Sequence, residues 1–281
     1  MVRYARLLKR GEEFLERWGL RQDGAPMSGR VSVVLPVVCG DGTRAALKLQ
    51  DVDEETVGEG LALRTWGGDG VVRLLAEDAE TGTLLLERLD EARPLAVVED
   101  VIEATRILAG LLARLTAVPA PEGLRRLDGV VVGMFERLPA VLKSLEEEGA
   151  DEADRRLLKD CAAAVGEVAG EPGDRLLHWD LHFENVLAAE REPWLVIDPK
   201  PLGGDPGFEL LPALWNRFEE GRLARRFDLL TGVVGLERER ARAWTLGRVL
   251  QNSLWRVEEG GGDGEALDAE QMAIARWLLG R

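Results

Sequence analysis

The sequence predicts an α+β protein with two lobes, a small strand-rich N-terminal lobe and a larger helical C-terminal lobe. Short apolar and β-branched runs joined by glycine turns fill residues 1–89, a pattern typical of hairpins. Long Ala-, Leu-, Glu- and Arg-rich segments with helical periodicity fill much of residues 90–281. A chain of 281 residues, 46% of them hydrophobic, is long enough for two such lobes sharing a cleft.

Each predicted element follows from a local pattern and its stop signals. In the N-terminal lobe we expect a helix ending at Trp18, a strand pair at 30–39 and 43–50, a helix at 53–66 and a strand pair at 71–78 and 83–89. A hinge is expected at 87–94. In the C-terminal lobe we expect helices at 97–118, 129–147 and 151–169, short strands at 176–178 and 194–197, and helices from 208 onward.

The charge balance limits the partners that the sequence favours. Its 36 basic and 51 acidic residues give a net charge of −15, which repels nucleic acid and anionic membranes and attracts cationic small molecules. Cys39 and Cys161 have no CxxC spacing, so we expect no disulfide and a cytoplasmic location. No segment approaches the roughly 18 apolar residues that a membrane span needs. No pattern indicates an oligomeric state.

Both histidines of the chain flank one aspartate. His178 and His182 lie two residues on either side of Asp180, Asn185 follows, and Asp198 comes directly after the apolar run at 194–197. Phosphoryl transfer needs a carboxylate that orients the attacking hydroxyl and accepts its proton, and hard oxygen ligands that hold Mg²⁺ against a triphosphate. The spacing of these residues is therefore typical of a magnesium–phosphate site.

This arrangement resembles the catalytic loop of protein kinases. His178-x-Asp180-Leu181-x-x-x-Asn185 has that loop's spacing, and Asp198 stands where the aspartate of the kinase DFG motif would be.

A closer resemblance is to the aminoglycoside phosphotransferases, in particular the streptomycin 6-phosphotransferase and hydroxyurea phosphotransferase group. It rests on residues 194–209, WLVIDPKPLGGDPGFE, on residues 84–89, LLLERL, and on the order of elements around both. It implies a protein-kinase-like fold, ATP and Mg²⁺ as cofactors, and transfer of the γ-phosphate to a hydroxyl group of an aminoglycoside such as streptomycin. Hydroxyurea, or an unrelated metabolite alcohol or amine, remains open as the acceptor.

The resemblance also assigns roles to individual residues. Asp180 would be the catalytic base, and Asn185 and Asp198 would bind Mg²⁺. Lys48, within the predicted strand at 43–50, would contact the ATP phosphates. Residues 1–89 would thus form the nucleotide-binding lobe, and residues 90–281 the hinge and the lobe that carries the catalytic loop and the acceptor site.

Further nucleotide contacts follow from the same resemblance. Glu59 would be the ion-pair partner of Lys48, with Glu55, one turn earlier, as the alternative. The backbone from Glu87 to Leu89 would hydrogen-bond the adenine.

The sequence departs from the family pattern beside the catalytic aspartate. Trp179 stands where the phosphotransferases often have glycine, and we expect its ring to influence the acceptor pocket. No clean GxGxxG loop covers the phosphates. Candidate acidic residues for recognising a cationic acceptor are Glu209, Glu219, Glu220, Glu258, Glu259 and Asp263.

Two rival functions use the same residues. A metallohydrolase would suit the case in which one face of a strand carries His178, Asp180 and His182. This function leaves Asn185 and Asp198 without a role. A catalytically dead, kinase-shaped binding protein is the other rival, and the presence of a base, metal ligands and a candidate lysine argues against it.

Overall fold

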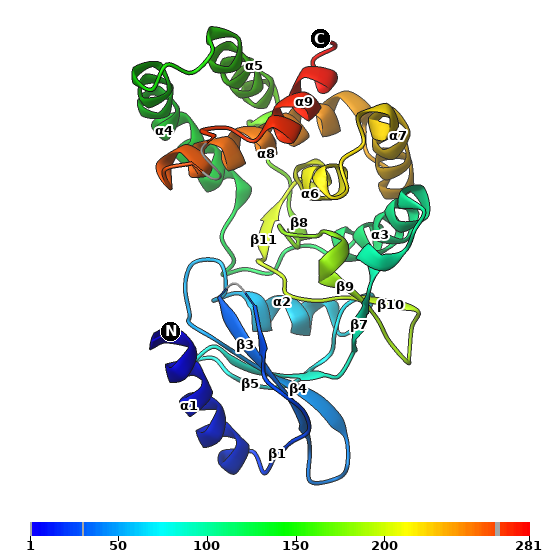
Figure 1. Ribbon diagram of the computed structural model, residues 1–281. Helices are drawn as coiled ribbons and strands as arrows, with labels where there is room; N and C mark the ends of the chain where they lie inside the picture. The colour runs from blue at the N-terminus through cyan, green and yellow to red at the C-terminus, as the bar shows by residue number, and fades with distance from the viewer. Residues whose placement is uncertain (1, 30, 262–264) are drawn as a thin grey trace. The chain divides into compact units, whose positions relative to one another are not determined.

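A computed structural model describes residues 2–29, 31–261 and 265–281. The chain forms two compact units (Figure 1). The first comprises Met1–Val97 together with Glu184–Pro201, and the second comprises Val98–Phe183 together with Leu202–Arg281. The fold is mixed α+β, with strands concentrated in the N-terminal part and helices in the C-terminal part, as the sequence predicts.

The first unit is built on a six-stranded antiparallel sheet. Its order is β1-β3-β4-β6-β5, with β2 also pairing with β3. Both predicted hairpins are present. The strands are β1 (Arg21–Gln22), β2 (Met27–Ser28), β3 (Ser32–Val38), β4 (Arg44–Gln50), β5 (Leu74–Asp78) and β6 (Thr83–Glu87).

The first strand of the second hairpin begins later than the predicted strand at 71–78. Val71 forms a parallel bridge with Val196, and the Val72 amide donates to the Val196 carbonyl at 2.8 Å. These residues therefore pair with a segment more than a hundred positions later, and β5 begins only at Leu74. Such a long-range partner leaves no local signal in the sequence.

Helix α1 (Val2–Arg17) packs against β3 and β4. Leu7 and Phe14 are buried with Leu35 and Leu49 in one apolar cluster. A Cβ added to Gly11 would lie 2.7 Å from Cδ1 of Leu35. Glycine at this position therefore allows the helix to approach the sheet closely.

Helix α2 (Glu59–Trp66) is shorter than the predicted helix at 53–66. The Asp53 carboxylate accepts hydrogen bonds from the amides of Glu55 and Thr56 at 3.0 and 2.9 Å, which holds the preceding residues in turns. Aspartate side chains compete in this way with the helical hydrogen-bond pattern. The helix ends at Gly67, whose φ of 61° is left-handed, a conformation that glycine commonly adopts at the end of a helix.

A second, three-stranded sheet in the first unit has the order β10-β9-β7. Its strands are β7 (Asp90–Pro94), β9 (Val186–Ala188) and β10 (Trp194–Val196). Strand β7 lies within the segment expected to be only a hinge. Because β7 pairs with β9, residues 184–201 return to the first unit.

Helices dominate the second unit. Helix α8 is buried along most of its length and packs against α4 and α5, while α3 packs against α7. The helices are α3 (Val101–Thr116), α4 (Leu127–Glu147), α5 (Glu152–Val168), α6 (Leu210–Trp215), α7 (Leu223–Val234), α8 (Arg238–Glu258) and α9 (Ala269–Leu278). Strands β8 (Arg175–Leu177) and β11 (Leu202–Gly204) form a small antiparallel ladder.

Capping residues explain where several of these helices begin. Asp100, Asp151 and Asp268 accept hydrogen bonds from backbone amides in the first turns of α3, α5 and α9. The three long helices predicted between 97 and 169 are confirmed, with ends shifted by a few residues. Over the described parts of the chain, no helix combines the length and apolar character that crossing a membrane requires.

Candidate active site

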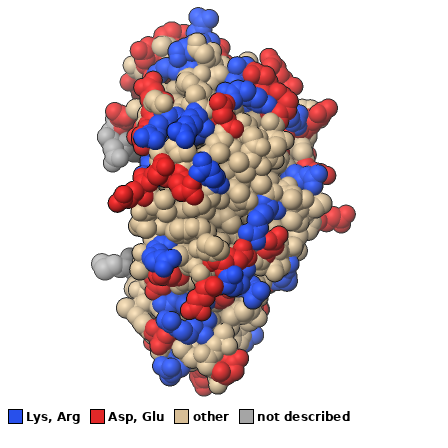
Figure 2. Space-filling view, turned by 90° about the vertical axis from the view of Figure 1, so that its right-hand side faces the viewer, with Lys and Arg blue, Asp and Glu red and all other residues tan. Residues whose placement is uncertain are grey.

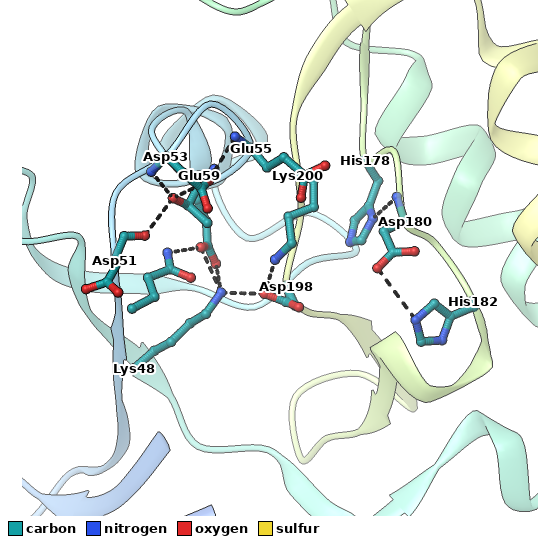
Figure 3. A network of polar contacts seen from close by, with 12 residues as sticks. Lys48, Asp51, Asp53, Glu55, Glu59, His178, Asp180, His182, Asp198 and Lys200 are labelled. Carbon is teal, nitrogen blue, oxygen red and sulfur yellow. Dashed lines mark hydrogen bonds and ion pairs between the residues drawn. The ribbon is translucent and has the colours of Figure 1, made fainter. Parts of the chain in front are cut away.

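A buried ion-pair network brings Lys48 together with Glu59 and Asp198 in the first unit (Figure 3). Strand β4 carries Lys48, which is 4% exposed, and its Nζ lies 2.7 Å from both carboxylate oxygens of Glu59, the first residue of α2. The same Nζ lies 2.5 Å from Oδ1 of Asp198. The side-chain amide of Gln50 also donates to Glu59. Lys48 is thus paired with Glu59, the first of its two suggested partners.

The charges in this network keep one another ionised. Burial lowers the pKa of Lys48, but the carboxylates of Glu59 and Asp198 outweigh that effect, and its pKa stands above the usual lysine value. Burial raises the pKa of Asp198, whereas Lys48 and Lys200 lower it, and the net pKa lies well below the ordinary aspartate value. A carboxylate in this state can bind a cation at neutral pH.

Asp198 presents its carboxylate between two lysines. Lys48 and Lys200 both donate to Oδ1, at 2.5 and 2.8 Å, and both lysine side chains are less than one-tenth exposed. The Asp198 side chain is 33% exposed. Its backbone has a φ of 58°, a left-handed conformation uncommon for a residue other than glycine. Sparsely populated backbone conformations of this kind cluster at functional sites.

The β9–β10 hairpin links Asn185 to the strand that precedes Asp198. The amide of Ile197 donates to the backbone carbonyl of Asn185 at 2.9 Å. Asn185 is buried and, like Asp198, belongs to the first unit. The two predicted magnesium ligands therefore come from the two ends of one short hairpin.

The predicted base, Asp180, lies in the second unit on the loop that follows β8 (Figure 3). Its amide donates to Nδ1 of the fully buried His178 at 3.3 Å. Oδ2 of Asp180 lies 3.8 Å from Nε2 of His182. Farther along the loop, the amide of Phe183 donates to the side-chain oxygen of Asn216 at 3.0 Å. Local hydrogen bonds on both sides of Asp180 therefore fix the course of the loop.

Trp179 is a core residue. Its φ of 72° is left-handed, which explains on physical grounds why glycine suits this position. The ring is 2% exposed and packs against Phe208 and Trp255 at centroid distances of 5.3 and 5.6 Å. The guanidinium groups of Arg125 and Arg248 lie 4.4 and 4.0 Å from the ring centroid. Stacking by cations and aromatic rings offsets the cost of the backbone conformation.

Glu209 is hydrogen-bonded to the backbone of the loop at Trp179. Its Oε1 accepts the amide hydrogen of Trp179 at 2.6 Å, and the side chain is buried. Burial raises the pKa of Glu209 to about 7, against the opposing effects of the Trp179 hydrogen bond and the charge of Arg248, and the charge of Asp180 adds to the rise. Glu209 therefore supports the backbone beside Asp180. We assign it this role in place of the expected recognition of a cationic acceptor.

The raised pKa of Glu209 predicts a pH-dependent stability. Because the folded-state pKa of about 7 exceeds the ordinary value of 4.5, the folded protein retains a proton between these pH values that the unfolded chain releases. The free energy of unfolding should therefore fall as pH rises through this window. In urea unfolding, the free energy of unfolding of wild type should fall between about pH 5 and about pH 8. The fall should exceed that of Glu209→Gln by on the order of 3 kcal/mol.

The exposed Glu220→Gln variant is the control for this measurement, and its unfolding free energy should follow wild type at every pH. If wild type and Glu209→Gln gave parallel curves, the carboxyl group would not titrate in this window.

The other predicted site residues have structural partners. The Glu87 amide donates to the Arg73 carbonyl at 3.0 Å, and its carboxylate pairs with Arg191 at 2.7 Å. Any adenine contact from this segment therefore uses groups other than the Glu87 amide. Leu89 is buried.

Among the acidic acceptor candidates, Glu219 pairs with Arg222 and Glu258 pairs with Arg137. Glu220 and Glu259 are exposed. Asp263 lies outside the described residues. On the face drawn in Figure 2, acidic and basic side chains are interspersed and form no single acidic patch.

The metallohydrolase reading is wrong. Strand β8 ends at Leu177, so His178, Asp180 and His182 do not share a strand face. Across the described ranges, no group of three or more His, Cys, Asp or Glu side chains is arranged to hold a metal ion. Cys39 and Cys161 are both free thiols.

The fold has counterparts among solved structures. The solved structure of a choline/ethanolamine kinase family protein from Mesorhizobium loti is similar to this chain, with a TM-score of 0.70 at 15% identity, covering 98% of this chain and 95% of that one. At that identity the similarity shows the fold alone, which is the protein-kinase-like fold of small-molecule kinases.

Sequence comparison identifies the family. The family of aminoglycoside/hydroxyurea antibiotic resistance kinases matches residues 17–260. Hydroxyurea phosphotransferase of Kitasatospora aureofaciens is 64% identical over 272 residues, 96% of this chain and 78% of that protein. Streptomycin 6-kinase of Streptomyces glaucescens is 56% identical over 277 residues, 96% of this chain and 88% of that protein. The chain belongs to the aminoglycoside/hydroxyurea antibiotic resistance kinases, and it is an ATP-dependent phosphotransferase.

Lys200 was not among the residues predicted for the site. Lys200 carried a signal, because it is one of only five lysines in the chain and stands two positions after Asp198. Glu209 was predicted only as a candidate for acceptor recognition, and its hydrogen bond to the Trp179 amide, 30 positions away, left no signal in the sequence.

Proposed function

We propose that this enzyme transfers the γ-phosphate of ATP to a hydroxyl group of an aminoglycoside, with streptomycin as the first acceptor to test. The observation that carries the reaction type is the convergence of two buried lysines, Lys48 and Lys200, on the partly exposed carboxylate of Asp198. Such a set of charges suits a metal–triphosphate complex.

The residues fit Mg²⁺ and ATP. Asp198 is ionised and partly exposed, and both lysines donate to its Oδ1. Asn185 would supply an amide oxygen from the other end of the same hairpin. Oxygen ligands of this type, completed by water and phosphate oxygens, are those that Mg²⁺ prefers. When bound, Mg²⁺ would neutralise charge on the β- and γ-phosphates and hold them for in-line transfer.

The chain's own residues would perform the remaining tasks. Asp180 would accept the hydrogen bond of the acceptor hydroxyl, orient its oxygen toward phosphorus and take its proton as the new bond forms. Lys48, held by Glu59, would bind phosphate oxygens. His178 and Glu209 would keep the loop around Asp180 in place. Residues 1–89 would supply most nucleotide contacts, including the backbone at Leu89, and residues 90–281 the acceptor side.

A specific observation keeps hydroxyurea as the second candidate acceptor. The relative that phosphorylates hydroxyurea, by its name, is 64% identical, against 56% for the streptomycin 6-kinase. In addition, two cations, Arg125 and Arg248, stack on the ring of Trp179, next to Asp180. A small neutral acceptor avoids the repulsion that a guanidinium-bearing one would meet there.

An ADP-release assay with ATP, Mg²⁺ and one acceptor at a time separates these candidates. We expect streptomycin to stimulate ADP release well above the rate without acceptor, and transfer to be confirmed by the mass of the phosphorylated product. Stimulation by hydroxyurea alone would establish the second candidate. If neither acceptor nor any other aminoglycoside stimulated ADP release, the antibiotic assignment would fall, although the kinase fold would stand.

A further inference from the structure

We propose that Lys200 is a second phosphate-binding lysine that contacts the transferred γ-phosphoryl group. The proposal rests on the function proposed above and adds to it a catalytic residue located two positions after the metal-binding aspartate. The juxtaposition that carries it is the meeting of two buried lysines on one oxygen of Asp198 (Figure 3).

The use of lysine in this chain is selective. Only five of its 36 basic residues are lysines. Lys9, Lys143 and Lys159 are exposed, whereas Lys48 and Lys200 are 4% and 7% exposed and both end at Oδ1 of Asp198. Lysine presents a compact, strongly hydrated charge that is costly to bury, so burial of two such groups needs a reason beyond surface solubility.

The two lysines have different supports. Lys48 is held by two contacts to Glu59, which is in turn held by Gln50, so Lys48 has a fixed carboxylate of its own. Lys200 donates to Asp198, the residue predicted to bind Mg²⁺, and its charge also lowers the pKa of Asp53. Once Asp198 shares its negative charge with a metal ion, the ammonium group of Lys200 gains from a further anion at the same place.

The charges identify that anion. Lys48 corresponds to the kinase lysine that pairs with the α- and β-phosphates. The γ-phosphate is the group whose additional charge distinguishes ATP from ADP, and it lies beside the metal ion that Asp198 would hold. During transfer, the bond from phosphorus to the β,γ-bridging oxygen breaks, the bond to the acceptor oxygen forms, and the acceptor proton passes to Asp180. Lys200 would remain protonated throughout and stabilise the charge on the peripheral oxygens.

Binding of two nucleotides, measured without turnover, tests this role. Isothermal titration calorimetry would compare Mg·ADP with Mg·AMP-PNP, which retains a γ-phosphate but resists transfer. Lys200→Met should weaken binding of Mg·AMP-PNP about tenfold or more, which is the size of one charge-assisted hydrogen bond. It should weaken binding of Mg·ADP by less than about threefold. Lys48→Met should weaken both nucleotides by similar factors. The exposed Lys9→Met variant is the matched control and should change neither.

Each outcome decides the question. If Lys200→Met weakened binding of both nucleotides equally, Lys200 would act on the metal or on Asp198. If it weakened binding of neither, Lys200 would be structural. Either result overturns the proposal. If wild type bound neither nucleotide, the proposed function itself would fail. Partial misfolding reduces the number of binding sites and leaves the ratio of the two affinities unchanged, and Lys200→Gln supplies the same ratio should the methionine variant not fold.

Discussion

Replacing Asp180 by asparagine should lower kcat by about 10²- to 10⁴-fold, the usual contribution of a positioned general base. Asparagine retains the volume of the side chain but cannot accept the proton of the acceptor hydroxyl. Nucleotide affinity should stay within about threefold of wild type, since Lys48, Glu59, Asp198 and Lys200 are paired among themselves. The measurements are steady-state ADP release and calorimetric binding of Mg·ADP.

Asp174→Asn is the matched control. It makes the same substitution six residues earlier, on an exposed side chain at the start of β8, and kcat should not change. If Asp180→Asn retained more than about a tenth of wild-type kcat, Asp180 would not be the base, because the loss would fall below the range for general base catalysis.

Much of the fold could be predicted because its signals are local. The hairpin at β3 and β4 is encoded by a glycine turn, and Asp41 accepts a hydrogen bond from the Thr43 amide at 2.9 Å within it. Helices α3 and α5 begin directly after capping aspartates. Strands β7 and β9 could not be predicted, because five and three residues carry no useful periodicity and their pairing joins segments almost a hundred positions apart.

The candidate site, like the fold, could be predicted only where its signals are local in the sequence. The spacing of Asp180, Asn185 and Asp198 in the sequence indicated the chemistry, and Lys48 is paired with Glu59 as expected. The roles of these residues stay predictions until variants are measured. The surroundings of Asp180 could not be predicted. The stacking of Arg248 on Trp179 joins α8 to the loop that carries Asp180, and only the folded chain brings these residues together.

Arg226 is the other buried charge whose role appears only in the structure. It belongs to α7, and its guanidinium donates to the backbone carbonyls of Ala213, Asn216 and Arg217. The side-chain oxygen of Asn216 in turn accepts the amide hydrogen of Phe183, on the loop that carries Asp180, at 3.0 Å. Burial lowers the pKa of Arg226 to about 10, so the group stays charged at neutral pH. Arg226 thus stabilises the turn after α6 against which the loop is held.

Arg226→Met should reduce the free energy of unfolding by roughly 3 kcal/mol or more, as measured by urea denaturation. The substitution removes the cost of burying a charge, an effect that alone would stabilise the protein. However, it also leaves three carbonyls of the turn without this donor, and each such loss costs about 1–3 kcal/mol. Since three acceptors lose one shared donor group, we expect the second effect to dominate.

Arg225→Met is the control, because Arg225 is the preceding residue of α7 and is exposed. Its unfolding free energy should stay within about 0.5 kcal/mol of wild type, as for most surface substitutions. If Arg226→Met were equally stable, desolvation of the guanidinium would cancel its hydrogen bonds. Arg226 would then be retained to position the loop, and its loss would lower kcat without lowering stability. A loss of stability together with kcat would instead mean that the turn after α6 both holds the fold and orients Asp180.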